Sequence, residues 1–281
     1  MTIKLVPATH FDIETLTSTF NDAYEGYMMP VNVPPQWMKR NIVKNDLNLD
    51  LSLVAVQDDA TVGICLVGQR GNLGWIGGVG VALPHRRQGI GWQLMEGALK
   101  NARAANLSAV DLEVIIGNDG AYAMYQRLGF ETTAKLLILT REPSPLSDSP
   151  TLQGITITTL PFDDTIPYYE AFHATENPWQ RQKPSLIADS AHFTNFVALQ
   201  DSAPVAYLIA RITDSAIMMM DAGFEESNDQ AMFTLLNSLH SDHAEKTIRV
   251  INISEKAPVT HLLLQTDYIE TMAQHAMRII L

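Results

Sequence analysis

Residues 81–92 read VALPHRRQGIGW, and they join a segment with strand character to one with helical character. The run WIGGVGVAL, which overlaps the start of this stretch, predicts a strand, and the run QLMEGALKNARA after it predicts a helix. The first turn of a helix has N–H groups without helical partners and a partial positive charge, so it attracts anions. Gly89 and Gly91 keep the backbone accessible, and Arg86 and Arg87 add local positive charge. The stretch therefore predicts a phosphate-binding loop.

Two common phosphate-binding motifs do not fit this loop. A P-loop requires G-x-x-x-x-G-K-S/T, and the lysine and the hydroxyl residue are both missing here. A dinucleotide-binding fingerprint requires G-x-G-x-x-G directly after the first strand of a βαβ unit, whereas the run GGVGV is followed by strand residues and Pro84. Another class of phosphate compound must be the ligand.

The segments around the loop predict an α/β sheet with an antiparallel start and a parallel crossover in the middle. The predicted strands of the first half are 3–8, 51–57, 61–70, 75–83, 109–116 and 132–139. The predicted helices are about 11–24 and 36–43, and two more that begin after Gly91 and at Asn118.

The second half of the chain repeats features of the first. VAVQDDATVG from Val54 is answered by VALQDSAPVA from Val197, and both have the pattern of a hairpin. YQRLGFE from Tyr125 is answered by LLQTDYIE from Leu263. Two similarities in the same order indicate a tandem duplication.

A segment rich in Pro and Ser separates the two repeats and predicts a linker. We therefore expect a first domain over residues 1–143, a linker over 144–153 and a second domain over 154–281. A chain of 281 residues is long for one domain and sufficient for two.

Composition and charge exclude several classes of function. The net charge is −12, and residues 146–281 carry 7 Lys and Arg against 17 Asp and Glu, which disfavours nucleic acid as a partner. The sequence contains no tract of about 18 apolar residues, which is the length needed to cross a membrane. The only cysteine, Cys65, cannot form an intrachain disulfide. We therefore expect a cytoplasmic protein that binds neither nucleic acid nor membranes.

Two motifs in the first half resemble the signatures of the GNAT superfamily of acetyltransferases. The pyrophosphate-binding signature Q/R-x-x-G-x-G/A matches Arg86, Arg87, Gln88, Gly89, Ile90 and Gly91. The second signature has an Asn, an Ala three residues later, a Tyr seven residues later and a Gly-Phe pair. It matches Asn118, Ala121, Tyr125, Gly129 and Phe130. The resemblance covers about residues 50–140 and fades on both sides.

This resemblance implies a fold, a cofactor and a reaction. The fold would be two tandem GNAT-like domains of the α/β class, each with a mixed, mostly antiparallel twisted sheet flanked by helices. Acetyl-CoA would be the co-substrate, with its pyrophosphate on the loop from Arg86 to Gly91. Its pantetheine arm would bond the backbone of Val79 and Val81, and Asn118 would reach it from the far side. Gly77 and Gly78 fit a bulge or close approach there, or simple packing.

The chemistry requires a base for the amine and an acid for the departing thiolate. Tyr125 stands where the superfamily places its acid, although it also belongs to an apolar helix face and could be a core residue. Glu113 is the candidate base. It shares a strand face with Asp111, whereas a strand covered by helices should be apolar on both faces. Two carboxylates on this face therefore suggest that it opens on a cleft. Glu113 could instead be a solvated strand carboxylate.

An aromatic and methionine cluster marks the region where the superfamily shapes its acceptor pocket, although such clusters are also typical of a core. Its members are Tyr24, Tyr27, Met28, Met29 and Trp37. His240 and His243 share a helix face without a third ligand nearby, so we expect no metal site.

The second half lacks the features that carry the resemblance. Glu225, Glu226 and Asp229 replace the arginines of the loop, and Leu263 stands opposite Tyr125. Like charges repel a phosphate, so we expect a GNAT-like domain without a CoA site.

The sequence thus predicts an acetyl-CoA-dependent N-acetyltransferase in which only the first domain is catalytic. The acetyl group would pass to a primary amine by direct attack in a ternary complex. The acceptor would be a small-molecule amine or a peptide N-terminus, and the protein a monomer or homodimer. A non-catalytic acyl-CoA-binding sensor or interaction protein is the alternative, and a second half that serves only as a structural cap also stays open.

Overall fold

The structure is a computed structural model, and its described residues divide into two compact units. It describes residues 2–29, 31–144, 154–173, 176–226 and 228–281. The first unit comprises residues 1–133 together with 276–281, and the second comprises 134–275. The expected boundaries differ from this division, because the chain enters the second unit within a strand and its last six residues return to the first. The predicted linker over 144–153 lies outside the described residues except for Ser144.

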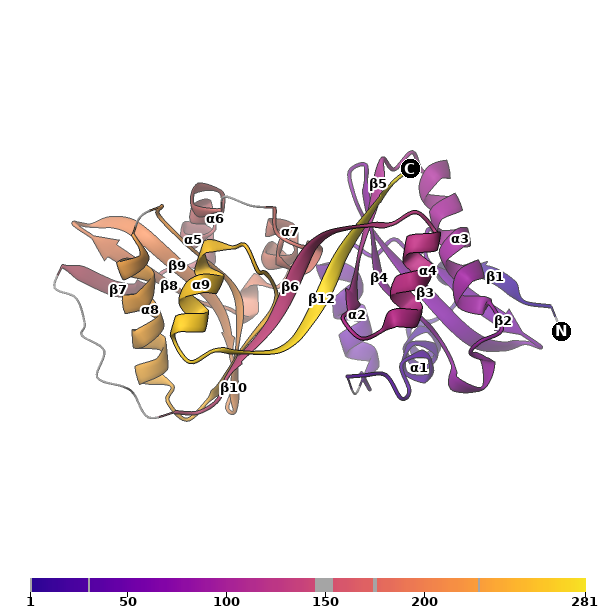
Figure 1. Cartoon of the computed structure of the whole chain (residues 1–281), viewed down its shortest axis with the longest axis horizontal. Helices are drawn as coiled ribbons and strands as arrows, with labels where there is room; N and C mark the ends of the chain where they lie inside the picture. Colours follow the sequence, from indigo (N-terminus) through magenta and orange to yellow (C-terminus); the bar gives the residue numbers. More distant parts are fainter. Residues whose placement is uncertain (1, 30, 145–153, 174–175, 227) are drawn as a thin grey trace. The chain divides into compact units, whose positions relative to one another are not determined.

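The first unit contains most of the predicted helices and strands of the first half (Figure 1). Its strands are β1 (Lys4–Pro7), β2 (Leu53–Gln57), β3 (Ala60–Arg70), β4 (Leu73–Val81), β5 (Ala109–Ile115), the start of β6 (Glu131–Arg141) and the end of β12 (Ile269–Ile280). Its helices are α1 (Ile13–Ala23), α2 (Pro35–Lys44), α3 (Ile90–Ala104) and α4 (Asp119–Arg127), with 3-10 turns at Ala8–His10 and Leu83–His85.

The sheet of the first unit is mixed. Neighbouring strands follow the order β1, β2, β3, β4, β5 and the end of β12. The pairs β1–β2, β2–β3 and β3–β4 are antiparallel, whereas β4 and β5 are parallel and joined through α3. This arrangement is the predicted antiparallel start followed by a parallel crossover.

Helices cover both faces of this sheet. On one face, α3 and α4 pack against a buried cluster that includes Cys65, Leu94, Leu112 and Tyr125. On the other face, a Cβ added to Gly78 or Gly80 would meet side chains of α1. The two faces differ because successive residues of a strand point to opposite sides.

The second unit has the same plan (Figure 1). Its strands are β7 (Ile155–Thr159), β8 (Thr194–Gln200), β9 (Ala203–Ile212), β10 (Ala216–Phe224), β11 (Thr247–Ser254), the rest of β6 and the start of β12. Its helices are α5 (Phe162–Thr165), α6 (Pro167–Phe172), α7 (Lys183–Ile187), α8 (Asp229–Asp242) and α9 (Pro258–Gln265), with 3-10 turns at Trp179–Arg181 and Ser190–His192. Here β10 and β11 form the parallel pair.

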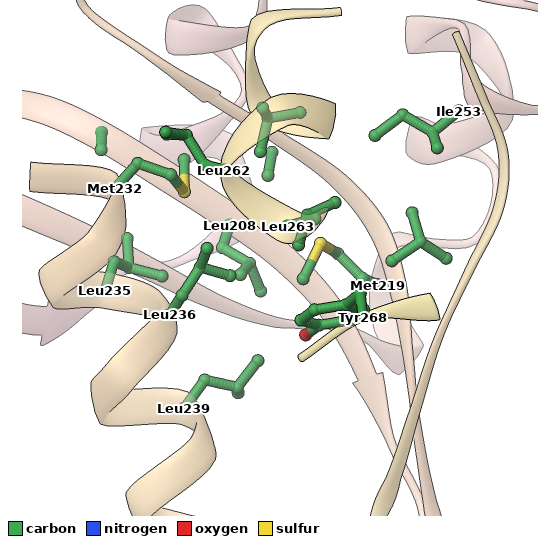
Figure 2. Close-up of a cluster of buried hydrophobic side chains, with 14 of the residues drawn as sticks. Leu208, Met219, Met232, Leu235, Leu236, Leu239, Ile253, Leu262, Leu263 and Tyr268 are labelled. Atoms are coloured by element: carbon green, nitrogen blue, oxygen red, sulfur yellow. The ribbon is translucent and has the colours of Figure 1, made fainter. Parts of the chain in front are cut away.

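The core of the second unit lies between the sheet and helices α8 and α9 (Figure 2). Leu235, Leu236 and Leu239 of α8 meet Leu262 and Leu263 of α9 over the strands. Each of these leucines is at most 2% exposed. Burial of a leucine side chain contributes roughly 1.5–3 kcal/mol, so this layer is a main source of stability for the second unit.

The predicted duplication reappears in the turns of the two sheets. Asp58 and Asp59 have positive φ in the β2–β3 turn, and Asp201 and Ser202 have positive φ in the β8–β9 turn. These two pairs are separated along the chain by the same offset as the two hairpin sequences. Two-residue hairpin turns of this kind require positive φ at both central residues, so the two hairpins have the same turn at matching positions.

The bulges of the two sheets recur at the same offset. The β3–β4 ladder shifts register at Gly77, and the β9–β10 ladder shifts register at the matching residue, Met220. Shared bulges at matching positions are specific features that unrelated sheets would not reproduce. The two units are therefore repeats in structure as well as in sequence.

The helices of the described residues include none that is long and apolar enough to span a membrane.

Candidate functional site

The predicted phosphate loop forms an open helix N-terminus. Arg87 and Gly89 both have positive φ, at 65° and 79°, and Gly89 is the N-cap of α3 without a side-chain cap. The first backbone bond of the helix runs from the Gln93 N–H to the Gly89 carbonyl. A Cβ added to Gly89 would meet nothing within 4 Å. The N–H groups of the first turn therefore face accessible space, as anion binding requires.

The equivalent helix of the second unit is closed at its N-terminus. The side chain of Asn228 caps α8, with Oδ1 accepting from the Ala231 N–H at 3.3 Å. Glu225 and Glu226 before it and Asp229 in its first turn are exposed. One donor is thus already satisfied, and the nearby carboxylates repel a phosphate.

A cavity of about 400 Å³ lies next to the strand that leads to the phosphate loop. It is lined by Ala23, Tyr24, Gly26, Tyr27, Met28, Val79, Gly80, Val81, Arg86, Gly117 and Asn118. Strands β4 and β5 pair only as far as Ile76 and Leu112, so beyond these residues the two strands no longer bond to each other. The cavity takes up the space beside the unpaired end of β4.

The backbone of β4 directs hydrogen-bonding groups into this cavity. The Val81 carbonyl accepts from Arg86 Nε at 2.8 Å, and the next N–H, of Ala82, donates to β3 at Val62. Because alternate residues of a strand direct their N–H and C=O groups to opposite edges, Val79 and Val81 present theirs on the side away from β3. These are the two residues predicted to bond the pantetheine arm, and both line the cavity.

Arg86 holds the wall of the cavity together. Besides the Val81 carbonyl, its guanidinium donates to the Ala23 carbonyl at 3.1 Å and to the Glu25 carbonyl at 2.6 Å. These carbonyls belong to β4 and to the end of α1. The side chain therefore fixes α1 against β4, while Arg87 and Gln88 are exposed on the loop.

Two tyrosines and an asparagine form the polar side of the cavity. A backbone hydrogen bond from Val79 reaches the Tyr24 oxygen, and the Asn118 side chain bonds Tyr27. Burial raises the pKa of both phenols above the usual range. Asn118 is also the N-cap of α4, where Oδ1 accepts from the Ala121 N–H at 3.4 Å. Both phenols are neutral donors and acceptors at neutral pH.

Tyr125 lies in the core layer next to this cavity. Its side chain is 6% exposed and packs against Phe130 at 6.0 Å between ring centroids. Burial raises its pKa strongly, and the phenols of Tyr24 and Tyr27 and the thiol of Cys65 add to the effect. Tyr125 is not among the residues that line the cavity.

Glu113 is held by Trp75, whose Nε1 donates to Glu113 Oε2 at 2.9 Å. A Cβ on Gly77 would stand 2.5 Å from the indole ring, so the bulge residue must be glycine to accommodate Trp75. On the same strand face, Asp111 accepts from Arg278 Nε at 2.6 Å and from its second nitrogen at 2.8 Å. The carboxylates on this face are therefore bonded to protein groups and are not simply solvated. Glu113 is also absent from the cavity lining.

The structure brings Val79, Val81, Arg86 and Asn118 together around one cavity, and the other loop residues from Arg87 to Gly91 do not line it. Of the aromatic and methionine cluster, Tyr24, Tyr27 and Met28 line the cavity. Sequence reasoning missed Gly26 and Gly117, because no local motif predicts that these residues have positive φ. It also missed Trp75 and Arg278, the partners of the two carboxylates, because pairing across strands leaves no local signal.

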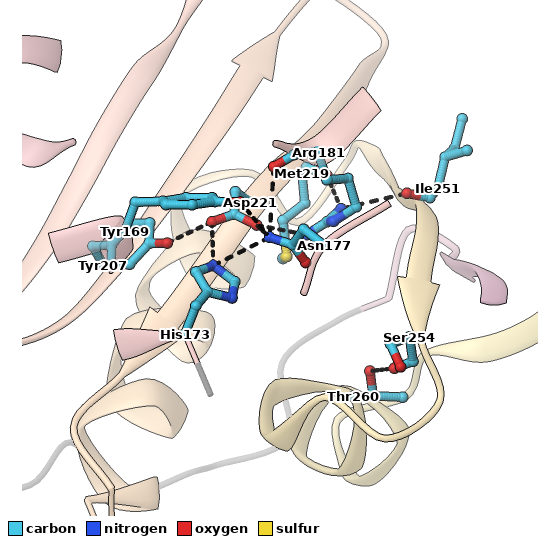
Figure 3. Close-up of polar contacts among 10 residues, drawn as sticks. All are labelled: Tyr169, His173, Asn177, Arg181, Tyr207, Met219, Asp221, Ile251, Ser254 and Thr260. Atoms are coloured by element: carbon cyan, nitrogen blue, oxygen red, sulfur yellow. Dashed lines mark hydrogen bonds and ion pairs between the residues drawn. The ribbon is translucent and has the colours of Figure 1, made fainter. Parts of the chain in front are cut away.

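A buried polar network occupies the corresponding place in the second unit (Figure 3). Asp221 follows the bulge of β10 as Gly78 follows the bulge of β4, and it is fully buried. Its Oδ2 accepts from Tyr207 at 2.5 Å and bonds His173 at 2.7 Å, and its Oδ1 accepts from Arg181 at 3.1 Å. In the first unit, Tyr24 and Phe20 approach the matching glycine instead, at 2.9 Å and 3.2 Å from an added Cβ.

No group of three or more His, Cys, Asp or Glu side chains within the described ranges could hold a metal ion. His240 is buried and bonds the Tyr268 hydroxyl at 3.1 Å. It has a structural partner within its own core.

Comparison with known proteins agrees with this geometry. Residues 14–130 match the model of the acetyltransferase (GNAT) family. A comparison with curated proteins finds no match.

Solved structures resemble the whole chain. A tandem GNAT protein from the clavulanic acid biosynthesis pathway has a TM-score of 0.75 at 14% identity, with 99% of this chain and 98% of that chain covered. A GCN5-related N-acetyltransferase from Sphaerobacter thermophilus has a TM-score of 0.70 at 14% identity, with 99% and 95% covered. A putative acetyltransferase from Pyrococcus horikoshii has a TM-score of 0.66 at 16% identity, with 99% and 89% covered.

The predicted fold class is thereby confirmed, since a mixed, mostly antiparallel sheet flanked by helices occurs in each unit and the tandem arrangement is that of solved GNAT structures. Residues 14–130 thus match the GNAT family model, and the whole chain has the fold of solved tandem GNAT structures.

Proposed function

We propose that the protein is an acetyl-CoA-dependent N-acetyltransferase whose first unit carries the reaction. The observation that carries this proposal is the cavity beside β4, which adjoins the open N-terminus of α3. The loop from Arg87 to Gly91 offers N–H groups for a pyrophosphate, and Val79 and Val81 offer strand groups for a pantetheine arm. Asn118 lines the same cavity.

The reaction would be direct attack of an amine on the thioester in a ternary complex. Glu113 would accept the proton of the amine, because its carboxylate lies on the strand face opposite the apolar core under α3. Tyr125 would donate its proton to the departing thiolate, because its buried phenol stays protonated at neutral pH and therefore has a proton to give. A small-molecule amine or a peptide N-terminus would be the acceptor.

The second unit would bind no acyl-CoA. The capping of α8 by Asn228 and the carboxylates beside it support this proposal. The Asp221 network supports it independently, because it places a buried ion pair of Asp221 and Arg181 on the strand that corresponds to β4. We therefore expect one acetyl-CoA per chain by calorimetry, and two equivalent sites would contradict the proposal.

A panel of small amines and peptides with acetyl-CoA, followed by thiol release, tests the activity. Tyr125→Phe should lower turnover by about 10²–10⁴-fold and leave acetyl-CoA binding nearly unchanged. Glu113→Gln should lower turnover at neutral pH and recover at high pH, where the free amine forms without a base. Tyr122→Phe is the matched control, since its hydroxyl bonds Thr132 on the exposed side of α4.

Full activity of both variants would assign Tyr125 and Glu113 to structural roles. Tight acetyl-CoA binding without thiol release from any acceptor would favour a sensor of acyl-CoA. The absence of Tyr125 and Glu113 from the cavity lining is the observation that keeps this second function in view.

A further inference from the structure

The Tyr24 hydroxyl lies where β4 presents an N–H group to the cavity. Val79 directs its backbone groups away from β3, and its hydrogen bond lowers the pKa of Tyr24. A bond that lowers the pKa of a phenol stabilises the phenolate, so the Val79 N–H donates and the phenol oxygen accepts. A Cβ on Gly78 would stand 2.9 Å from this hydroxyl. Glycine at that position thus lets the phenol reach the strand.

Neighbouring rings fix the position of the Tyr24 side chain. Phe20 packs against it at 4.5 Å between centroids, and Tyr27 meets it edge-on at 5.1 Å. If the carbonyl oxygen of a ligand accepted the hydrogen bond from the Val79 N–H, these rings would let the Tyr24 phenol move only a short distance. The phenol O–H could then donate a hydrogen bond to the same carbonyl oxygen.

The environment keeps the phenol protonated. Burial is the largest cause of its raised pKa, and the neighbouring Tyr27 and Cys65 groups add to it. Cys65 itself is buried, with its pKa raised to about 12. Tyr24 therefore remains a hydrogen-bond donor throughout the pH range in which an amine acetyltransferase works.

We propose that Tyr24 is a catalytic residue that donates a hydrogen bond to the thioester carbonyl oxygen of acyl-CoA, beside the N–H of Val79. The inference rests on the proposed function. When the amine nitrogen attacks the carbonyl carbon, the π electron pair moves onto the oxygen, and both donors stabilise that charge. The pair then re-forms the carbonyl as the C–S bond breaks, and the electrons of that bond leave on sulfur.

Tyr24 keeps its proton in every step. The proton of the amine goes to Glu113, and the thiolate takes its proton from Tyr125. This separation distinguishes a donor to the carbonyl oxygen from a second acid. A simpler alternative is that Tyr24 only accepts the hydrogen bond from the Val79 N–H until acyl-CoA displaces the phenol.

Tyr24→Phe tests the assignment, because phenylalanine keeps the ring packing against Phe20 and Tyr27 and removes only the hydroxyl. Tyr122→Phe is the control. The first measurement is the infrared carbonyl stretch of bound acetyl-CoA labelled with ¹³C at the carbonyl, which requires no acceptor. We expect a lower frequency in the wild type and in Tyr122→Phe than in Tyr24→Phe. The second is turnover, which should fall about 10²–10³-fold in kcat without a shift in the pH profile.

Equal carbonyl frequencies in the wild type and Tyr24→Phe would overturn the role of Tyr24 and leave the proposed function intact. Tighter acetyl-CoA binding by Tyr24→Phe with unchanged kcat would also overturn the catalytic role. It would show that Tyr24 only bonds the Val79 N–H until acyl-CoA displaces it. No acetyl-CoA binding by the wild type would instead overturn the proposed function, and this inference with it. If Tyr24→Phe does not fold, a fluorinated tyrosine at position 24 replaces it. Its more acidic hydroxyl should lower the carbonyl frequency further, and an unchanged frequency would refute the proposal.

Discussion

Gly89 combines two requirements that only glycine meets at the start of α3. Its φ of 79° is disfavoured for residues with a side chain, and the proposed function also requires that the backbone there stay accessible to a pyrophosphate. Backbone geometry explains the first requirement, whereas the second applies only if the loop binds an anion as proposed. Substitution can separate them, because the chain offers a second glycine with the same strain and no ligand.

Gly89→Val should weaken acetyl-CoA binding far more than Gly71→Val. Gly71 has a φ of 57° in the β3–β4 turn and, like Gly89, has nothing within 4 Å of an added Cβ. Each substitution should cost roughly 1–2 kcal/mol of folding free energy from left-handed backbone strain. Calorimetry gives the affinity and urea unfolding gives the stability. Equal acetyl-CoA affinity in the two variants would show that the pyrophosphate does not bind at this loop.

At the scale of elements, strands β4 and β10 show how one bulged strand serves two purposes. β4 carries Gly77, Gly78 and Gly80, so helix α1 approaches closely and the cavity stays open. β10 has the same bulge but carries Asp221, whose carboxylate bonds the side chains of Arg181 and His173. A buried charge of this kind is tolerated only while its partners are complete.

Asp221→Asn should therefore destabilise the second unit strongly. The amide has no charge to balance the Arg181 guanidinium, whose side chain is 5% exposed. Removal of one partner of a buried ion pair typically costs about 3–5 kcal/mol. Urea unfolding measures the change, with Asp214→Asn, at an exposed turn, as the control. A cost no larger than that of the control would show that the network is not a stabilising unit.

The prediction of elements from sequence succeeded where the signal was local. The loop from Arg86 to Gly91, the hairpins at Val54 and Val197 and the helix capped by Asn118 follow from turn residues and alternation within a few positions. The partners of Glu113 and Asp111 were not predictable, since Trp75 and Arg278 come from other strands. The roles of the cavity residues remain predictions, because the same side chains would also suit a plain core.

At the scale of the whole molecule, stability should depend on pH through His240. This side chain is 3% exposed, and its pKa is lowered to about 3, first by burial and then by the charge of Arg141. Between pH 3 and 6.5 the unfolded chain binds a proton that the folded chain does not, so stability falls as pH falls through this window. The loss from pH 7 to pH 5 is about 2 kcal/mol.

Urea unfolding at pH 7 and pH 5 checks this expectation. His240→Gln cannot titrate and keeps a group that can bond the Tyr268 hydroxyl, so its stability should change less between the two pH values. His192→Gln, at an exposed 3-10 turn, should behave like the wild type. The same pH dependence in all three proteins would assign the effect to other groups.

The division of the chain into units leads to a prediction about its C-terminus. The last six residues belong to the first unit, although the second unit separates them from it in sequence. Met277 and Ile279 are buried in the cluster that also holds Tyr125 and Phe130, and Arg278 pairs with Asp111. A chain that ends before residue 276 should therefore lose stability in the first unit. Loss of one such buried side chain alone costs about 2–5 kcal/mol.

Hydrogen exchange locates the effect of this deletion. Protection should fall in β5, whose neighbour in the sheet is lost, while β8 and β9 keep theirs. Met277→Ala is the milder companion, because it leaves the strand and the Arg278–Asp111 pair in place. A chain ending at Leu146 should fail in the same way, since it also lacks this strand. It would thus give no fair measure of what the first unit can catalyse by itself. Unchanged protection in β5 after the deletion would show that the first unit is complete without the C-terminal strand.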